Sequence, residues 1–294
     1  MQVKEVKTFN SYDLNAVFFI NDKVGYAVGG ERYGIGILMK TIDGGNSWTS
    51  PDSIMPKACY ASCFFSEQEG FVGGFDSHLT YTNDSAATIN DRVFISYLPV
   101  RAIKFKDRQS GVLAFGNGYG DGSIALTHDG GQSWTESSKY NHCFRAAAYT
   151  DDGTIFIAGY GTILVSQDGI NYTVSKQYGD FYTDLHFIND NTGFAVGYQG
   201  EILRTDNKGA KWEVMKKTNN PFEQPDHLLA VHFYDATNGV AVGENGLMLH
   251  TSDGGNSWKR AKAFTEKSLR DVILLSGSSG VIVAEGGSVF LFNL

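Results

Sequence analysis

The sequence lacks the features that mark several classes of protein. It contains three cysteines, Cys59, Cys63 and Cys143, an odd number without the spacing of metal ligands, so we expect buried free thiols and no metal or cofactor. It has no run of lysine and arginine and its formal net charge is −8, which disfavours nucleic acid as a partner. No apolar run approaches the length of a membrane span.

Export signals and helical periodicity are also missing. The N-terminal residues Met1–Val6 do not resemble a signal peptide, so any exporting segment is expected to be absent from this chain. No long stretch has an apolar period of 3.6 residues. The 35 glycines and the repeated Val, Ile, Phe and Tyr runs favour strands and turns, and 42% hydrophobic residues suffice for a large core.

A short phrase of the form Thr-x-Asp-Gly-Gly-x-Ser-Trp recurs along the chain. It begins at Thr41, Thr127 and Thr251, with weaker copies from Ser166 and Thr205. A degenerate copy begins with Thr-Asn-Asp. The anchor residues are separated by 41, 45, 39, 39 and 46 residues and are Asp43, Asp84, Asp129, Asp168, Asn207 and Asp253. A period of roughly 40 to 50 residues built from short strands predicts an all-β propeller.

The repeated phrase has a structural explanation. An aspartate in a tight turn accepts hydrogen bonds from backbone N–H groups two or three residues on, and the glycines supply positive φ. The tryptophan then begins the next strand and packs over the turn. We therefore assign a structural role in these hairpins to Asp43, Asp129, Asp168, Asp253, Trp48, Trp134, Trp212 and Trp258.

The strand pattern predicts seven blades in a single domain, residues 1–294. Innermost strands recur near residues 15, 60, 101, 145, 183, 229 and 270. The chain ends on a third strand, so the last blade is expected to be split between residues 1–9 and about 268–294. Pairing of the N-terminal strand with the C-terminal one would close the ring and remove an exposed edge.

The repeats carry a family resemblance. Their Ser/Thr-x-Asp-x-Gly-x-x-Trp turns resemble the Asp-box, or BNR, repeat of sialidases. The fuller unit, best developed in residues 193–212 and 239–258, resembles the photosystem II stability/assembly factor family, whose members are seven-bladed propellers. This resemblance implies a non-catalytic binding or assembly-assisting module that works outside the cytoplasm, in the periplasm, at the cell surface or as a secreted protein.

The resemblance also implies an arginine patch on one face of the ring. Alignment of the innermost strands on the glycine that follows them places one column of residues at the channel mouth: Asn15, Tyr60, Arg101, Arg145, Thr183, Leu229 and Arg270. The three guanidinium groups could bind a carboxylate or phosphate bidentately. Alternatively, each arginine pairs with a neighbouring acid such as Asp13, Asp184, Asp271 or Glu285.

Tyrosines extend the expected binding face. Tyr33, Tyr119, Tyr160 and Tyr198 fall in second-to-third strand loops, and the connection formed by residues 218–227 lies on the same side. Tyr182 is added from the start of an innermost strand. A tyrosine-lined rim suits a protein or peptide segment or an anionic glycan, although packing within the turns would explain the same residues.

A sialidase-like glycoside hydrolase is the alternative function. Its arginine triad would be Arg101, Arg145 and Arg270. A Tyr nucleophile and an acid would be drawn from Tyr182, Tyr60, Asp184 and Asp271. The chain lacks the Phe/Tyr-Arg-Ile-Pro element of sialidases. Two carboxylates, or a Tyr–Glu pair, converging within roughly 5–10 Å beside the arginines would favour the enzyme. His186 and His232 share a column and are expected to pack rather than to bind metal.

Overall fold

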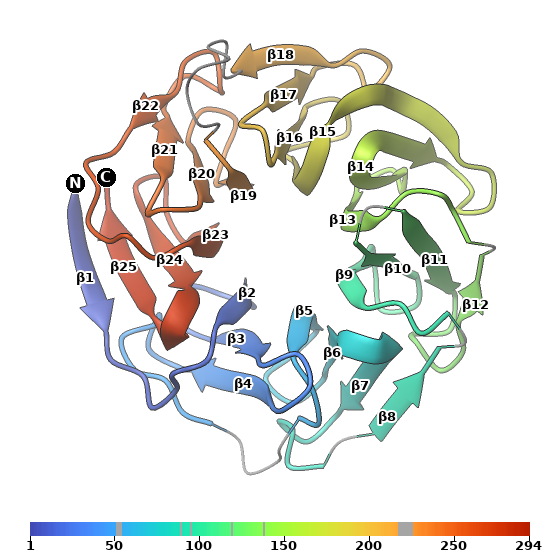
Figure 1. Ribbon diagram of the computed structural model, residues 1–294, viewed down its shortest axis with the longest axis horizontal. Helices are drawn as coiled ribbons and strands as arrows, with labels where there is room; N and C mark the ends of the chain where they lie inside the picture. Colours follow the sequence, from blue (N-terminus) through green and yellow to red (C-terminus); the bar gives the residue numbers. More distant parts are fainter. Residues whose placement is uncertain (51–54, 89, 95, 119, 138, 217–225) are drawn as a thin grey trace.

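The computed structural model shows β-sheets arranged in a ring (Figure 1). It describes residues 1–294 except 51–54, 89, 95, 119, 138 and 217–225. Its helical elements are two 3₁₀ turns, η1 (Phe75–Ser77) and η2 (Glu285–Gly287). Within the described ranges no helix is long and apolar enough to cross a membrane.

The strands of the first part of the chain form three sheets of antiparallel neighbours. In hydrogen-bonded order these are β2 (Leu14–Phe19), β3 (Gly25–Gly30) and β4 (Gly36–Thr41); β5 (Cys59–Phe64), β6 (Gly70–Gly74), β7 (His78–Thr82) and β8 (Asn90–Val93); and β9 (Val100–Phe105), β10 (Gly111–Asn117), β11 (Asp121–Thr127) and β12 (Thr135–Glu136).

The second part of the chain also forms three sheets. Their members are β13 (Phe144–Tyr149), β14 (Ile155–Ser166), β15 (Thr173–Phe187), β16 (Gly193–Gly197), β17 (Ile202–Thr205) and β18 (Glu213–Lys216); β19 (Leu228–Phe233), β20 (Gly239–Gly243), β21 (Met248–Thr251) and β22 (Lys259–Arg260); and β23 (Leu269–Leu274), β24 (Ser279–Ala284), β25 (Val289–Asn293) and β1 (Gln2–Val6).

The predicted count of seven blades is wrong, because the described strands form six sheets. The difference lies in β15, one continuous strand of 15 residues. Its first part pairs with β14 and its second part with β16, so β13 to β18 join in one six-stranded sheet. The sequence analysis began a new blade with an innermost strand near residue 183, but β15 starts earlier and continues through Gly179 and Asp180, residue types that are common in turns.

The two ends of the chain lie side by side (Figure 1). β1 pairs antiparallel with β25 over five residue pairs, from Gln2 opposite Asn293 to Val6 opposite Val289. Val6 is buried there against Val289 in a core cluster shared with β2 and β24. The N-terminal strand therefore covers the outer edge of the C-terminal one, as the sequence predicted.

Apolar side chains from neighbouring sheets form the core. Tyr26 of β3 stacks on Phe64 of β5 with ring centroids 3.6 Å apart, and Phe194 of β16 stacks on Phe233 of β19 at 4.0 Å. Middle strands such as Gly193–Gly197 and Gly239–Gly243 are buried throughout. Strands buried on both sides hold the blades together and fix the direction of the innermost strands.

The anchor side chains of the repeated turns accept backbone hydrogen bonds, as the sequence predicted, but the donor lies two or three residues on only at Asp168 and four residues on in the other turns. The carboxylate of Asp129 accepts bonds from the Thr127 hydroxyl and from the backbone and hydroxyl of Ser133. Gly130 and Gly131 have φ of 71° and 83°. Corresponding bonds are made by Asp43, Asp84, Asp168, Asn207 and Asp253.

The four tryptophans pack edge-on against phenylalanines. The distances between ring centroids are 6.3 Å for Trp48 and Phe19, 5.8 Å for Trp134 and Phe105, 6.1 Å for Trp212 and Phe187, and 5.8 Å for Trp258 and Phe233. Trp48 also donates to the Gly45 carbonyl, as a ring folded back over its turn would.

Candidate functional site

Each innermost strand carries one β-bulge where it enters the channel. In every case one residue is left out of the pairing with the neighbouring strand. These unpaired residues are Asn15, Tyr60, Arg101, Arg145, Thr183, Leu229 and Arg270. They are the column that the sequence alignment placed at the channel mouth, and a bulge turns such a side chain away from the regular pleat.

Glycines allow the chain to pass close to these bulges. A Cβ atom on Gly159 would lie 1.8 Å from the carbonyl oxygen of Cys143, and one on Gly243 would lie 1.9 Å from that of His227. No side chain fits at such distances. A glycine at the far end of the second strand thus lies at the level at which the inner strand bends.

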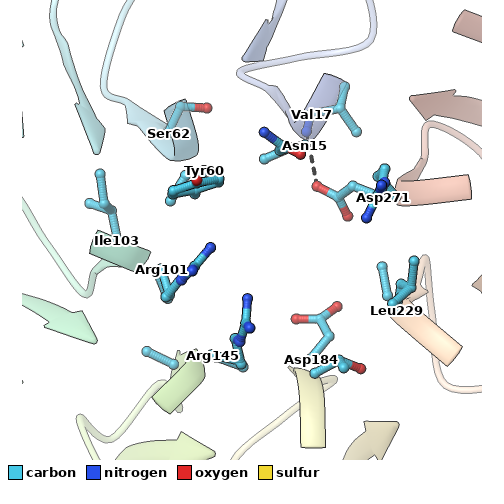
Figure 2. Close-up of a pocket in the computed structure, with 18 of the residues that line it drawn as sticks. Asn15, Val17, Tyr60, Ser62, Arg101, Ile103, Arg145, Asp184, Leu229 and Asp271 are labelled. Carbon is cyan, nitrogen blue, oxygen red and sulfur yellow. Dashed lines mark hydrogen bonds between the residues drawn. The ribbon is translucent and has the colours of Figure 1, made fainter. Parts of the chain in front are cut away.

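The bulge makes two successive residues of each strand line the channel. The unpaired residues form an upper layer, and the residues after them form a lower layer of Ala16, Ala61, Ala102, Ala146, Asp184, Ala230 and Asp271. Both layers line one cavity of about 460 Å³. Five alanines leave the lower layer wide, and Figure 2 shows charged side chains pointing into the resulting space.

Arg101 and Arg145 lie next to each other on one side of the mouth (Figure 2). The guanidinium of Arg101 lies 4.2 Å from the ring centroid of Tyr60, and that of Arg145 lies 5.2 Å from that of Phe181. Burial, followed by the charge of Arg145, lowers the pKa of Arg101 to about 10. The two cations therefore repel each other in a partly desolvated site.

Neither of these two arginines has a carboxylate partner. Arg101 donates through Nε to the Gly116 carbonyl at 3.1 Å, and the buried Nε of Arg145 has no hydrogen-bond partner. Across the described residues, neither guanidinium forms an ion pair. The alternative that every arginine of the column is neutralised by a neighbour does not hold for this pair.

Arg270 differs from them. Its guanidinium lies 2.7 Å from Glu285 and 3.4 Å from Asp13. These are two of the acids that the sequence offered as partners. Two nearby carboxylates offset the positive charge of this guanidinium and accept hydrogen bonds from it. The arginines of the column that have no carboxylate partner among the described residues are therefore Arg101 and Arg145.

Arg32 is a further arginine that the sequence analysis missed. It lies in the loop after β3, lines the same cavity, and its guanidinium lies 5.5 Å from the ring centroid of Phe75. Hydrogen bonding to Tyr60 raises the pKa of Arg32. The column of channel residues was found by comparing innermost strands, and Arg32 lies in a loop outside those strands, so the comparison did not include it.

Two aspartates face the interior of the channel from β15 and β23 (Figure 2). The carboxylate of Asp184 accepts the N–H groups of Leu185 and of Val231 in the next inner strand, at 2.8 and 2.9 Å. Asp271 accepts those of Val272 and Val17 at the same two distances. Each carboxylate thus links two neighbouring inner strands.

Burial raises the pKa of both aspartates. The pKa of Asp271 rises to about 7, chiefly because the side chain is buried and secondly because Asp184 carries a like charge. For Asp184 burial dominates, and the charge of Lys104 opposes it. Lys104 extends from β9 into the same cavity and is exposed. The cavity below the arginines therefore holds two carboxylates and one ammonium group.

His186 and His232 lie below the aspartates and pack together. Their ring centroids are 4.6 Å apart, and Nδ1 of His232 accepts the N–H of Leu274 at 3.3 Å. Burial lowers the pKa of His232 to about 4 and that of His186 well below its ordinary value. Both rings are neutral at pH 7. Within the described ranges no group of three or more His, Cys, Asp or Glu side chains could hold a metal ion.

The predicted tyrosines are distributed unevenly. Tyr198 lines the cavity, whereas Tyr33 and Tyr160 lie outside its lining and contact Phe75 and Phe181 at 5.0 and 5.8 Å between ring centroids. Tyr182 is buried in the core, and its hydroxyl donates to Glu201 at 2.8 Å. Tyr119 and residues 218–225 lie outside the described residues. Tyr182 is therefore no part of the mouth.

Tyr198 belongs to a polar group that the sequence did not reveal. Its hydroxyl donates to Glu244 at 2.5 Å, and Nδ1 of His227 lies 2.7 Å from the other carboxylate oxygen. The His227 ring stacks on Tyr198 with centroids 4.2 Å apart. Glu244 and Arg270 line the same cavity. A Tyr–Glu pair thus lies at the arginine-bearing mouth, which is one of the two arrangements named for the enzyme alternative.

Comparison with known proteins agrees with the repeats. Residues 172–267 match the family model described as photosynthesis system II assembly factor YCF48. The resemblance predicted from the repeats is confirmed over these residues. No curated protein matches the chain.

Solved structures share the fold over the whole chain. YCF48 bound to D1 peptide is 17% identical, with a TM-score of 0.76 over 100% of this chain and 94% of that one. YCF48 from Cyanidioschyzon merolae is 15% identical, with 0.73 over 99% and 98%. The WD40 β-propeller domain of Doa1 is also 15% identical, with 0.76 over 99% and 95%. At these identities the similarity shows the propeller fold alone.

Proposed function

We propose that this protein is a non-catalytic binding module that holds a segment of a partner protein at the channel mouth. Arg101 and Arg145 bind a carboxylate of that segment. The observation that carries the proposal is a pair of adjacent, partly buried guanidinium groups, stacked on aromatic rings and without a carboxylate partner among the described residues. An incoming anion relieves their repulsion and accepts charge-assisted hydrogen bonds.

The comparisons support the same role. A similar solved structure is YCF48 bound to D1 peptide, and part of this chain matches the YCF48 family model. A peptide is therefore the ligand class that we favour over a glycan. We further propose that the protein assists the assembly of its partner and works outside the cytoplasm. We also propose that the chain forms a single domain. The family resemblance supports each of these statements.

A short peptide with a free C-terminal carboxylate tests the site. The probe is acetyl-Gly-Gly-norleucine, compared with its C-terminal amide by isothermal titration calorimetry. We expect the free acid to bind, and Arg101→Gln/Arg145→Gln to weaken it at least about tenfold, since a hydrogen bond to a charged group contributes about 1.5–3 kcal/mol.

The control is Arg108→Gln/Arg260→Gln, which removes the same charge from two arginines with exposed side chains that line no part of this cavity. It should retain the affinity of the unaltered protein. Equal affinities for acid and amide, or full affinity in the Arg101/Arg145 variant, would contradict the proposal.

The alternative function is a sialidase-like glycosidase. The observation that favours it is the hydrogen-bonded Tyr198–Glu244 pair, which lines the same cavity as Arg270. This function is tested on the same preparations with a fluorogenic sialoside. The binding proposal expects no turnover. Hydrolysis that disappears in Tyr198→Phe would favour the enzyme instead.

A further inference from the structure

The two sides of the channel carry opposite charges that do not neutralise each other. The upper layer has Arg101 and Arg145 on β9 and β13, and the lower layer has Asp184 and Asp271 on β15 and β23 (Figure 2). The charge of Lys104 lowers the pKa of Asp184 against the effect of burial, and neither Arg101 nor Arg145 forms an ion pair with it among the described residues. A ligand that enters the mouth therefore meets a cationic level and then an acidic one.

Each aspartate keeps the capacity to bind a further donor. A carboxylate offers about four lone-pair positions, and each of these accepts two backbone N–H groups. Neither aspartate forms an ion pair within the described residues. The five alanines of the same layer leave room beside them in the cavity of about 460 Å³.

The surroundings offer one competing cation. His186 and His232 below the aspartates stay neutral at pH 7, because burial lowers the pKa of both. Lys104 is positive and faces the same cavity from β9. Two carboxylates against one ammonium group leave this part of the cavity with a net negative charge once both aspartates are ionised.

We propose that Asp184 and Asp271 form a subsite for one cationic side chain of the ligand, one layer below the arginine pair and on the other side of the channel (Figure 2). The channel then selects a peptide in which a carboxylate adjoins a lysine or arginine side chain. This inference rests on the proposed function and adds the chemistry of the neighbouring residue. Successive strand residues are about 3.3 Å apart, so the acidic layer lies within reach of the four-carbon stem of a lysine whose carboxylate is bound above.

An ammonium or guanidinium group suits this position better than a metal ion. All four carboxylate oxygens already accept a backbone N–H. A divalent ion would need to replace those bonds or find further oxygen ligands, and the other five residues of the layer are alanines. A side-chain cation needs only the remaining lone pairs.

Two peptides that differ in one charge test the subsite. The probes are acetyl-Gly-Gly-Lys and acetyl-Gly-Gly-norleucine, both with a free carboxylate, titrated into the full chain by calorimetry at pH 8. We expect the lysine peptide to bind about tenfold more tightly than the norleucine peptide, because one hydrogen bond to a charged group contributes about 1.5–3 kcal/mol. Asp184→Asn/Asp271→Asn should reduce that ratio to about one and leave the norleucine affinity unchanged.

The ratio of the two peptide affinities in the unaltered protein tests the acidic subsite by itself, so the test does not depend on whether the Asp184/Asp271 variant folds. Equal affinities for the two peptides would overturn the acidic subsite while leaving the arginine site intact. Failure of both peptides to bind would overturn the proposed function with it.

Lys104→Met gives an independent check. Removal of the competing ammonium group should raise the preference for the lysine peptide. A lower preference would show that Lys104 itself holds the ligand, and it would contradict the subsite.

Discussion

The turns on one face of the ring and the channel mouth on the other differ in how their charges are satisfied. At the turn, Asp129 is surrounded by the donors of Thr127 and Ser133, and the same bonds recur around the ring. In the channel, Arg101 and Arg145 lie together without a carboxylate partner in the described part of the chain. Repetition at the turns stabilises the fold.

The channel positions are the ones that depart from the repeat. The lower layer is alanine in five strands and aspartate in two, and the upper layer contains arginine in three strands. Because every inner strand bends at its bulge, any side chain placed there points into the cavity. The scaffold thus presents variable residues on a constant backbone, and the differences between repeats mark the candidate site.

Loss of the N-terminal strand should have the largest effect on the scaffold. Deletion of residues 1–9 exposes the outer edge of β25 and removes the buried Val6. We expect the loss of a large fraction of the about 5–15 kcal/mol that stabilises a typical native protein. Differential scanning fluorimetry and size-exclusion chromatography should show a much lower melting temperature or aggregation.

The matched control for this deletion is Lys7→Ala, which changes an exposed residue just beyond β1 and leaves the strand in place. It should melt like the unaltered protein. A deletion variant that melts at the same temperature as this control would show that closure by β1 does not stabilise the ring.

A change in a single turn should have a smaller effect. The buried Thr127 hydroxyl accepts the N–H of Gly131 and donates to Asp129. Thr127→Val keeps the shape but leaves that buried N–H without an acceptor, which costs about 1–3 kcal/mol. Chemical denaturation measures the loss, with Thr135→Val at an exposed position as control. Equal stability of the two variants would mean that the turn hydrogen bonds contribute little.

The same contrast explains what could be predicted from the sequence. The turns recur with fixed spacing, so their hydrogen bonds and the pairing of β1 with β25 followed from local pattern. The number of sheets did not, because Gly179 and Asp180 look like a turn while β15 continues through them. Whether a strand is interrupted depends on its neighbours, which a single segment does not specify.

The candidate site was predicted in part for a similar reason. Alignment on the following glycine found Arg101, Arg145 and Arg270 at one level, but it could not show that Arg270 alone is paired with Glu285. The partner of a side chain comes from another strand or loop. Tyr182 was misplaced because a bulge shifts the alternation, so the residue before Thr183 points into the core.

The smallest predicted effect concerns the acidic layer and its dependence on pH. Burial and the charge of Asp184 raise the pKa of Asp271 from 3.8 to about 7, so the folded protein retains a proton that the unfolded chain releases between these values. Stability from this group therefore falls as the pH rises through that window and is level above about pH 7.

Asp271→Asn removes the titrating group, so its melting temperature relative to the unaltered protein should rise by a few degrees from pH 5 to pH 8. The turn residue Asp253 provides the opposite case. Hydrogen bonds from Ser257 lower its pKa to about 2, so its contribution is lost only in acid, below about pH 4. Asp253→Asn should therefore differ from the unaltered protein by a constant amount between pH 5 and pH 8. Parallel curves for both variants would show that Asp271 is ionised throughout this range, and the channel would then carry its full negative charge at pH 5.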